Sequence, residues 1–381
     1  KWECGDLLRA VGLTDRFDDE TIPLFVADMD FPCPEPVVQA LRERVDKTIF
    51  GYSLHWSDPE YVNAIRHWFS RRHQWEIEED SIVYCPGTVE AIVNLIRTFT
   101  DIGDGVIIQP PVYSPFRNSI LANHRQVINN PLVNTNGDGF YEIDFEDFER
   151  KAADPRNKLF LLCSPHNPVG RVWNETELRT LAELCAKHGI ILVADEIHGD
   201  LVRKDVQFQA IRTLVDDEQI IVCTAINKTF NTAGLHCSNI IIDNGIMRDA
   251  FKKEMGMRLP SPFSISALIA AYTEGEDWLN QVNDYIDGNL DFLGRFLSDY
   301  MPKVKYRIPE GTYIAWMDFS GYDLPDREIH RRIYRKANVV LEDGERFGDG
   351  GQGFQRICVP SPRSLIRTAM ERIRTQFRDL E

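Results

Sequence analysis

Five short motifs of polar and special residues directly follow apolar runs in the middle of the chain. They are P-G-T-V-E at 86–90, P-V-Y at 111–113, S-P-H-N-P-V-G at 164–170, D-E-I-H at 195–198 and N-K-T-F-N at 227–231. In open α/β sheets, ligands bind at the carboxyl ends of the strands, so these motifs are candidates for one shared site. Their side chains include an amine, carboxylates, amides and a phenol.

Two of these motifs suggest a specific chemistry. Lys228 follows the apolar run 220–226. A lysine that loses water at the end of a buried strand becomes neutral more easily than an exposed one and then acts as a nucleophile. Gly87, Thr88 and Val89 open a predicted helix, whose unpaired N–H groups favour a bound anion. An amine and the start of a helix therefore lie at the carboxyl ends of two predicted strands.

The elements that position these motifs alternate between apolar runs and helical patterns, which is typical of a mostly parallel sheet covered by helices. The predicted strands are 81–85, 105–109, 126–133, 159–163, 190–194, 220–226 and 239–242. One helix is predicted over 89–99. A second is predicted between Asn174, with Glu177 three residues later, and Gly189. The expected fold class is α/β, with a seven-stranded, mostly parallel sheet.

The pattern changes after residue 260. A long helix over about 277–300 precedes two strands at 313–319 and 354–359 and a final basic helix, which predicts a smaller α+β C-terminal domain. We expect an N-terminal arm at 1–40 that packs on this small domain, a large domain at 41–275 and the small domain at 276–381. The Gly-rich stretch 348–353 predicts a tight turn.

Composition and charge exclude several classes of function. Lys and Arg number 43 against 59 Asp and Glu, a formal charge of -16 that disfavours nucleic acid and anionic membranes. No run approaches eighteen apolar residues, and acidic residues at 3, 6, 15, 18, 19 and 20 argue against a signal peptide. We expect a cytoplasmic protein. The eight cysteines, Cys4 among them, lack the spacing of a disulfide framework or a metal site, which indicates small buried apolar residues.

Taken together, the motifs resemble those of the fold-type I pyridoxal 5'-phosphate (PLP) enzymes, the aspartate aminotransferase superfamily, over almost the whole chain. Six segments are similar to the C–S lyase branch that includes cystalysin and the MalY/PatB cystathionine β-lyases. They are V-A-D-M-D-F at 26–31, F-G-Y at 50–52, C-S-P-H-N-P-V-G-R-V-W at 163–173, D-E-I-H at 195–198, K-T-F-N-T-A-G at 228–234 and P-E-G-T-Y at 309–313. The resemblance implies an aspartate-aminotransferase-like fold and PLP as cofactor.

The resemblance also implies which residues contact the cofactor. Lys228 would hold PLP as a Schiff base and, once released, remove the Cα proton of the substrate as general base. Asp195 would keep the ring nitrogen protonated, which PLP needs in order to withdraw electrons. Asn167 and His198 would contact the phenolic oxygen. Tyr113 would stack on the ring and border the substrate.

Other matching positions are implied to bind the phosphate and the substrate. The phosphate would lie on the backbone amides of Gly87, Thr88 and Val89. Tyr52 matches a tyrosine that reaches the phosphate and substrate of the neighbouring subunit, which implies a homodimer with shared active sites. Arg356 would bind the α-carboxylate of a small amino-acid substrate, because a planar guanidinium offers two donors to one carboxylate.

The chain departs from the family pattern at several positions. Ser114 stands where relatives commonly have a second tyrosine, Asn227 where they have a serine, and Cys358 where they have an asparagine. Thr88 replaces a valine of the phosphate loop. Ala225 replaces a phosphate-binding serine that is frequent in transaminases, which favours the lyase branch.

The predicted activity is a PLP-dependent C–S β-lyase, which eliminates a thiol from cystathionine, cysteine or an S-substituted cysteine to give pyruvate and ammonia. An aminotransferase is the first alternative, because it would use the same cofactor residues. A regulatory protein that keeps the PLP fold for protein–protein contact is the second.

Overall fold

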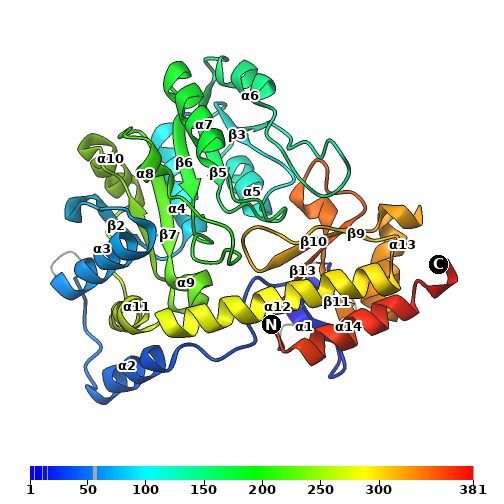
Figure 1. Ribbon diagram of the computed structural model, residues 1–381. Helices are drawn as coiled ribbons and strands as arrows, with labels where there is room; N and C mark the ends of the chain where they lie inside the picture. Colours follow the sequence, from blue (N-terminus) through cyan, green and yellow to red (C-terminus); the bar gives the residue numbers. More distant parts are fainter. Residues whose placement is uncertain (4, 11, 15, 55–57, 381) are drawn as a thin grey trace.

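The computed structural model describes residues 1–3, 5–10, 12–14, 16–54 and 58–380, and Figure 1 shows the arrangement of the elements. Cys4 lies outside the described residues. The central feature is a seven-stranded sheet in the order β2-β8-β7-β6-β5-β3-β4. Its strands are β2 (Ile82–Cys85), β3 (Gly105–Ile108), β4 (Gln126–Asn129), β5 (Asn157–Cys163), β6 (Ile191–Asp195), β7 (Ile221–Ala225) and β8 (Ser238–Ile241). Each lies within two residues of a predicted strand at its start, which confirms the predicted sheet.

The sheet is parallel except for β8, which runs antiparallel to both β2 and β7. Side chains alternate between two apolar cores, since successive residues of a strand point to opposite faces. On β5, Leu159 and Leu161 pack with α4 (Thr88–Phe99), and Phe160 and Leu162 pack with α7 (Glu175–His188). Figure 1 shows α7 in front of the sheet and α4 behind it.

Helix α7 shows how local sequence signals fix an element. The Asn174 side chain accepts a hydrogen bond from the Glu177 N–H at 3.0 Å, and the Glu177 carboxylate accepts one from the Asn174 N–H at 2.8 Å. Gly189 ends the helix at a φ of 68°, a left-handed conformation that glycine adopts without steric cost. The predicted start and stop of this helix are both confirmed.

The other helices of this part of the chain flank the sheet or connect its strands. They are α3 (Pro59–His73), α5 (Ser114–Ala122), α6 (Phe145–Ala152), α8 (Ile211–Leu214), α9 (Ile226–Thr229), α10 (Gly245–Met255) and α11 (Pro262–Glu274). The single turn α9 follows β7 without a break. Lys228 therefore lies at the carboxyl end of that strand.

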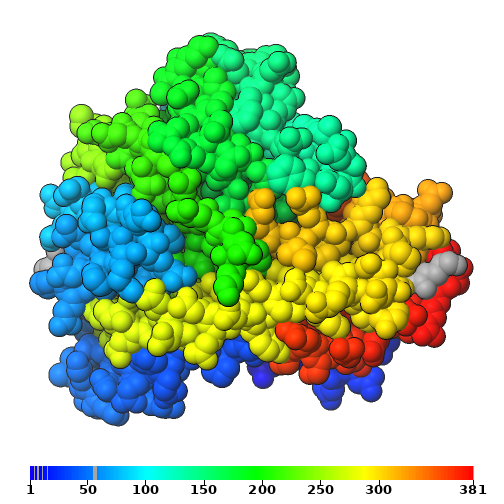
Figure 2. All heavy atoms as spheres, in the orientation of Figure 1, coloured from blue at the N-terminus to red at the C-terminus, as the bar shows by residue number. Residues whose placement is uncertain are grey.

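The C-terminal part has its own sheet, with antiparallel strands in the order β12-β13-β10-β9. Its strands and helices are β9 (Lys305–Tyr306), β10 (Ile314–Asp318), β12 (Glu342–Asp343), β13 (Phe354–Cys358), α12 (Glu276–Tyr300), α13 (Asp326–His330) and α14 (Arg363–Thr375). Helix α12 runs beneath both parts of the molecule as a continuous yellow band in Figure 2. The long helix, both strands and the final helix were predicted, and each is present.

The N-terminal segment makes two kinds of contact. Strand β1 (Ile22–Pro23) pairs in parallel with β11 (Val339–Val340), which joins the segment to the C-terminal part. Helix α1 (Gly5–Ala10) precedes this strand, and α2 (Glu35–Asp46) follows it and packs against α11. The boundaries of the arm and of the two domains stay predictions.

Of the cysteines that the structure describes, Cys85, Cys163, Cys185, Cys223, Cys237 and Cys358 are buried and Cys33 is partly buried. No helix in the described ranges is long and apolar enough to cross a membrane.

Candidate active site

A cavity of about 310 Å³ lies where the carboxyl ends of β5, β6 and β7 meet the N-terminal segment and β13. Its lining includes six of the predicted site residues: Tyr113, Asn167, Asp195, His198, Lys228 and Arg356. They come from five separate stretches of the sequence. The fold therefore brings them together at the predicted sheet edge.

Lys228 is held at this edge by the buried strand β7 and the turn α9. Its Nζ donates a hydrogen bond to the carbonyl of Ala27 at 2.6 Å. Burial lowers the pKa of the Lys228 amine, because the charged form loses its hydration. The neutral, nucleophilic form is therefore reached more easily than in an exposed lysine.

Asp195 is the last residue of β6 and is only 5% exposed. Its carboxylate accepts a long hydrogen bond from the Ile197 N–H at 3.4 Å. Burial raises the pKa of Asp195 to about 7, although this hydrogen bond and the charge of Lys228 act in the opposite direction. The ionised form of Asp195 would be stabilised by a cationic group placed in the cavity.

His198 and Asn167 border the same cavity. His198 is buried, its Nδ1 has no hydrogen-bond partner among the described residues, and burial lowers its pKa to about 3. Its ring packs edge-on to Tyr313 with centroids 5.6 Å apart. The Asn167 side-chain oxygen accepts a hydrogen bond from Arg356 at 3.2 Å. His198 is therefore a neutral imidazole with a nitrogen left to bind a ligand.

Tyr113 precedes α5 and is positioned through its backbone, since its N–H donates to the carbonyl of Asn167 at 3.0 Å. Burial raises the pKa of the Tyr113 phenol to about 12. The phenol therefore stays protonated in the physiological range. Its partly buried ring forms one side of the cavity.

Arg356 lies on β13 and is 4% exposed. Besides its bond to Asn167, the guanidinium donates to the carbonyl of Phe25 at 2.8 Å and forms an ion pair with Glu342. Its Nε is buried and has no hydrogen-bond partner within the described part of the chain. The Nε–H group of Arg356 can therefore donate a hydrogen bond to an acceptor atom of a ligand in the cavity.

The remaining predicted residues do not line the cavity. Gly87 is the N-cap residue of α4, and since it has no side chain, the first N–H groups of the helix are not capped there. The space beside its Cα is open, with no atom within 4 Å of the Cβ position. Thr88 and Val89 form the first turn of that helix. Tyr52 is 96% exposed and lies outside the cavity lining.

Residues 19–373 match the sequence profile of the family described as aminotransferase class I and II. The chain belongs to this family. It is 40% identical to cystathionine beta-lyase PatB of Bacillus subtilis over 98% of this chain and 95% of that protein. It is 33% identical to protein MalY of Escherichia coli over 93% of this chain and 91% of that protein.

Solved structures show the same relation. Cystalysin from Treponema denticola, whose crystal structure contains a pyridoxal 5'-phosphate cofactor, superimposes with a TM-score of 0.94 at 36% identity. The match covers 99% of this chain and 95% of that protein. The expected aspartate-aminotransferase-like fold is therefore confirmed.

Two parts of this aminotransferase-family cavity were not predicted as site residues. The segment 25–27 lines the cavity, where the carbonyl of Phe25 accepts from Arg356 and that of Ala27 accepts from Lys228. Glu342 pairs with Arg356. The motif at 26–31 was a signal for the first, because it was part of the family resemblance. Nothing in the sequence pattern singled out Glu342.

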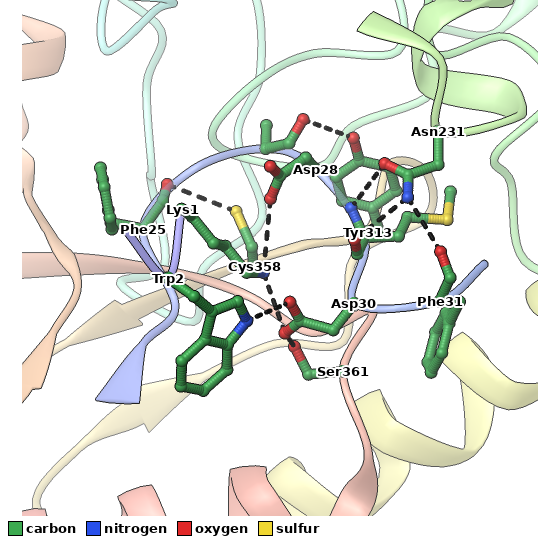
Figure 3. Close-up of polar contacts among 12 residues, drawn as sticks. Lys1, Trp2, Phe25, Asp28, Asp30, Phe31, Asn231, Tyr313, Cys358 and Ser361 are labelled. Carbon is green, nitrogen blue, oxygen red and sulfur yellow. Dashed lines mark hydrogen bonds and ion pairs between the residues drawn. The ribbon is translucent and has the colours of Figure 1, made fainter. Parts of the chain in front are cut away.

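Family motifs also explain how this segment is held, as Figure 3 shows. The hydroxyl of Tyr313 donates to the carbonyl of Ala27 at 2.8 Å. The side chain of Asn231 accepts from the Met29 N–H at 3.0 Å and donates to the carbonyls of Met29 and Phe31, both at 3.1 Å. The motifs K-T-F-N and P-E-G-T-Y thus fix the wall of the cavity opposite the sheet.

Proposed function

We propose that this protein is a PLP-dependent C–S β-lyase, which cleaves the Cβ–S bond of cystathionine, cysteine or an S-substituted cysteine. The products are a thiol, pyruvate and ammonia, with one water consumed. The observation that carries the proposal is one cavity in which a desolvated Lys228 amine, a buried Asp195 carboxyl and the Arg356 guanidinium meet. The names of the relatives PatB and cystalysin support the same reaction class.

The residues present fit PLP. Asp195 is a buried carboxyl that lacks a close cation, and His198 Nδ1 and Arg356 Nε are buried donors or acceptors without partners among the described residues. The uncapped start of α4 at Gly87 offers backbone N–H groups to a phosphate. When bound, PLP supplies an electron sink that stabilises negative charge at the substrate Cα.

We assign the transfer of the Cα proton to Lys228 and the protonation of the cofactor's ring nitrogen to Asp195. The Lys228 amine, whose pKa is lowered by burial, would hold the cofactor and, once released, would accept the Cα proton of the substrate. The Asp195 carboxylate would hold the proton on the ring nitrogen of the cofactor. Loss of the thiolate from Cβ follows the loss of the Cα proton.

The other residues orient the two ligands. Arg356 Nε binds the α-carboxylate of the substrate, while its other nitrogens stay on Asn167 and Phe25. Tyr113 would stack on the cofactor ring, a contact worth about 0.5–1.5 kcal/mol beyond its burial. Asn167 and His198 would contact the phenolic oxygen of the cofactor.

We also propose a homodimer in which Tyr52 completes the site of the partner. The exposed apolar side chains around it support this assignment, because Ile49, Phe50 and Leu54 are each more than 40% exposed. Such a cluster is typical of a surface that another chain covers. The cytoplasmic location stays a prediction.

The test is product analysis with purified protein and added PLP. Cystathionine, cysteine and alanine are supplied separately, and pyruvate and thiol are measured without any keto-acid acceptor. We expect both products from the first two compounds and neither from alanine. Turnover that strictly requires a keto-acid acceptor would instead identify an aminotransferase.

A further inference from the structure

Glu342 is a second carboxylate in the cavity that the proposed reaction does not use. It lies on β12, directly opposite Arg356 in the antiparallel register with β13, and its side chain is 18% exposed. It lines the cavity and forms an ion pair with an NH2 group of Arg356. The Arg356 guanidinium, which we propose binds the substrate carboxylate, is therefore already paired with the carboxylate of Glu342.

The ion pair between Arg356 and Glu342 constrains which substrates can bind in the cavity. A substrate α-carboxylate on Arg356 Nε would lie close to the Glu342 carboxylate, and two anions on one guanidinium repel each other. A positive charge elsewhere on the substrate would offset that repulsion. Of the described residues that line the cavity, only Asp195 and Glu342 carry carboxyl groups, and Asp195 serves the cofactor.

We propose that Glu342 is a specificity-determining residue, which selects substrates with a second cationic group on the sulfur arm. An aminoalkyl thioether brings an ammonium that binds Glu342 while the α-carboxylate binds Arg356. A plain alkyl thioether leaves the repulsion in place. The inference rests on the proposed function, because it takes Arg356 as the carboxylate ligand.

The test uses two substrates of equal arm length, S-(2-aminoethyl)-L-cysteine and S-propyl-L-cysteine. We expect the PLP-loaded protein to favour the aminoethyl compound by about tenfold or more in kcat/KM for thiol release, the scale of one hydrogen bond to a charged group. Glu342→Gln should bring this ratio close to one, since it keeps the size and the acceptor oxygen but removes the charge.

Glu345→Gln is the matched control. Glu345 lies three residues further along the chain, is exposed and does not line the cavity. This variant loses the same charge and should keep the wild-type ratio. Equal rates for the two substrates in wild type, or an unchanged ratio in Glu342→Gln, would overturn the inference.

A binding measurement separates this inference from the proposed function. L-lysine and L-norleucine are similar in length, differ in the terminal ammonium and carry no leaving group on Cβ. We expect calorimetry with the PLP-loaded protein to show about tenfold tighter binding of lysine in wild type and no preference in Glu342→Gln. Equal binding in wild type would overturn the role of Glu342. If no S-substituted cysteine is cleaved, the proposed function fails and this comparison still decides the inference.

Discussion

Asp195 is the last residue of β6 and Asp200 follows it by five residues; both carboxyl groups are buried, and their surroundings are opposite. Asp195 accepts a long hydrogen bond from a backbone N–H, and burial raises its pKa to about 7. Asp200 accepts hydrogen bonds from Arg72 Nε at 3.0 Å and Thr229 Oγ1 at 3.0 Å and pairs with His73 Nε2 at 2.9 Å. Burial alone would raise the pKa of Asp200, but these partners lower it.

The difference distinguishes a structural carboxylate from one that serves a ligand. Asp200 has its partners within the protein and ties α3 to Thr229, the residue next to Lys228. Asp195 has no comparable partner and faces the cavity. Burial of a carboxyl without a cation costs free energy, so a site that keeps one is a candidate for a cationic ligand.

Asp195→Asn should have the largest effect on catalysis. The amide cannot hold the proton on the cofactor nitrogen by charge, so we expect kcat/KM for pyruvate formation to fall by about 10²–10³-fold or more. In Asp200→Asn, kcat/KM per folded molecule should fall by much less. Similar losses in both variants would remove the distinction between the two aspartates.

Asp200→Ala should have the largest effect on stability. The substitution removes the buried partner of the His73 ring and one of the two carboxylates that pair with the partly exposed Arg72, which keeps Glu276. Because the cost of breaking a fully buried pair is about 3–5 kcal/mol, we expect a loss of about 2–4 kcal/mol. The free energy of unfolding from urea titration measures this loss. A cost below about 1 kcal/mol would contradict the structural role.

The two aspartates should also give opposite pH dependences in cofactor-free protein. Between about pH 4 and 7, unfolded Asp195 is ionised while folded Asp195 keeps its proton, so folding takes up a proton and stability falls as pH rises. Asp195→Asn should remove this pH-dependent loss of unfolding free energy, which is on the order of 2–4 kcal/mol.

Asp200 has a lowered pKa, so its contribution is present above its unfolded pKa and is lost as pH falls through the folded one. The stability difference between wild type and Asp200→Asn should therefore shrink in acid below about pH 4. Unfolding curves from pH 3 to pH 8 measure both profiles. A difference that does not depend on pH would be inconsistent with this account.

Thr229→Val should have the smallest effect. It removes one of the hydrogen bonds to Asp200, worth about 1–2 kcal/mol, and leaves those from Arg72 and His73. Thermal unfolding checks the stability. We expect kcat to change by less than about tenfold, and a larger loss would give Thr229 a direct role beside Lys228.

Local patterns in the sequence predicted the sheet and the side of the cavity that faces it. Lys228 and Asp195 were identifiable because each follows an apolar run of the sequence, and the start and end of α7 were identifiable from Asn174 and Gly189. Arg356 was singled out by its motif alone.

The parts that were missed depend on contacts between distant segments. The backbone from Phe25 to Ala27 reaches Lys228 because β1 pairs with β11 and Tyr313 holds it. Glu342 faces Arg356 through the register of two short strands, and Asp200 depends on side chains of α3. Local periodicity carries no information on such pairings.

The central claim is that Lys228 is the lysine that holds PLP. The most direct measurement is borohydride reduction of the PLP-loaded protein, followed by proteolysis and mass spectrometry of the modified peptide. The account predicts one pyridoxyl group, on Lys228, and none in Lys228→Ala. A stable adduct on another lysine, or no adduct in protein that forms pyruvate, would contradict it.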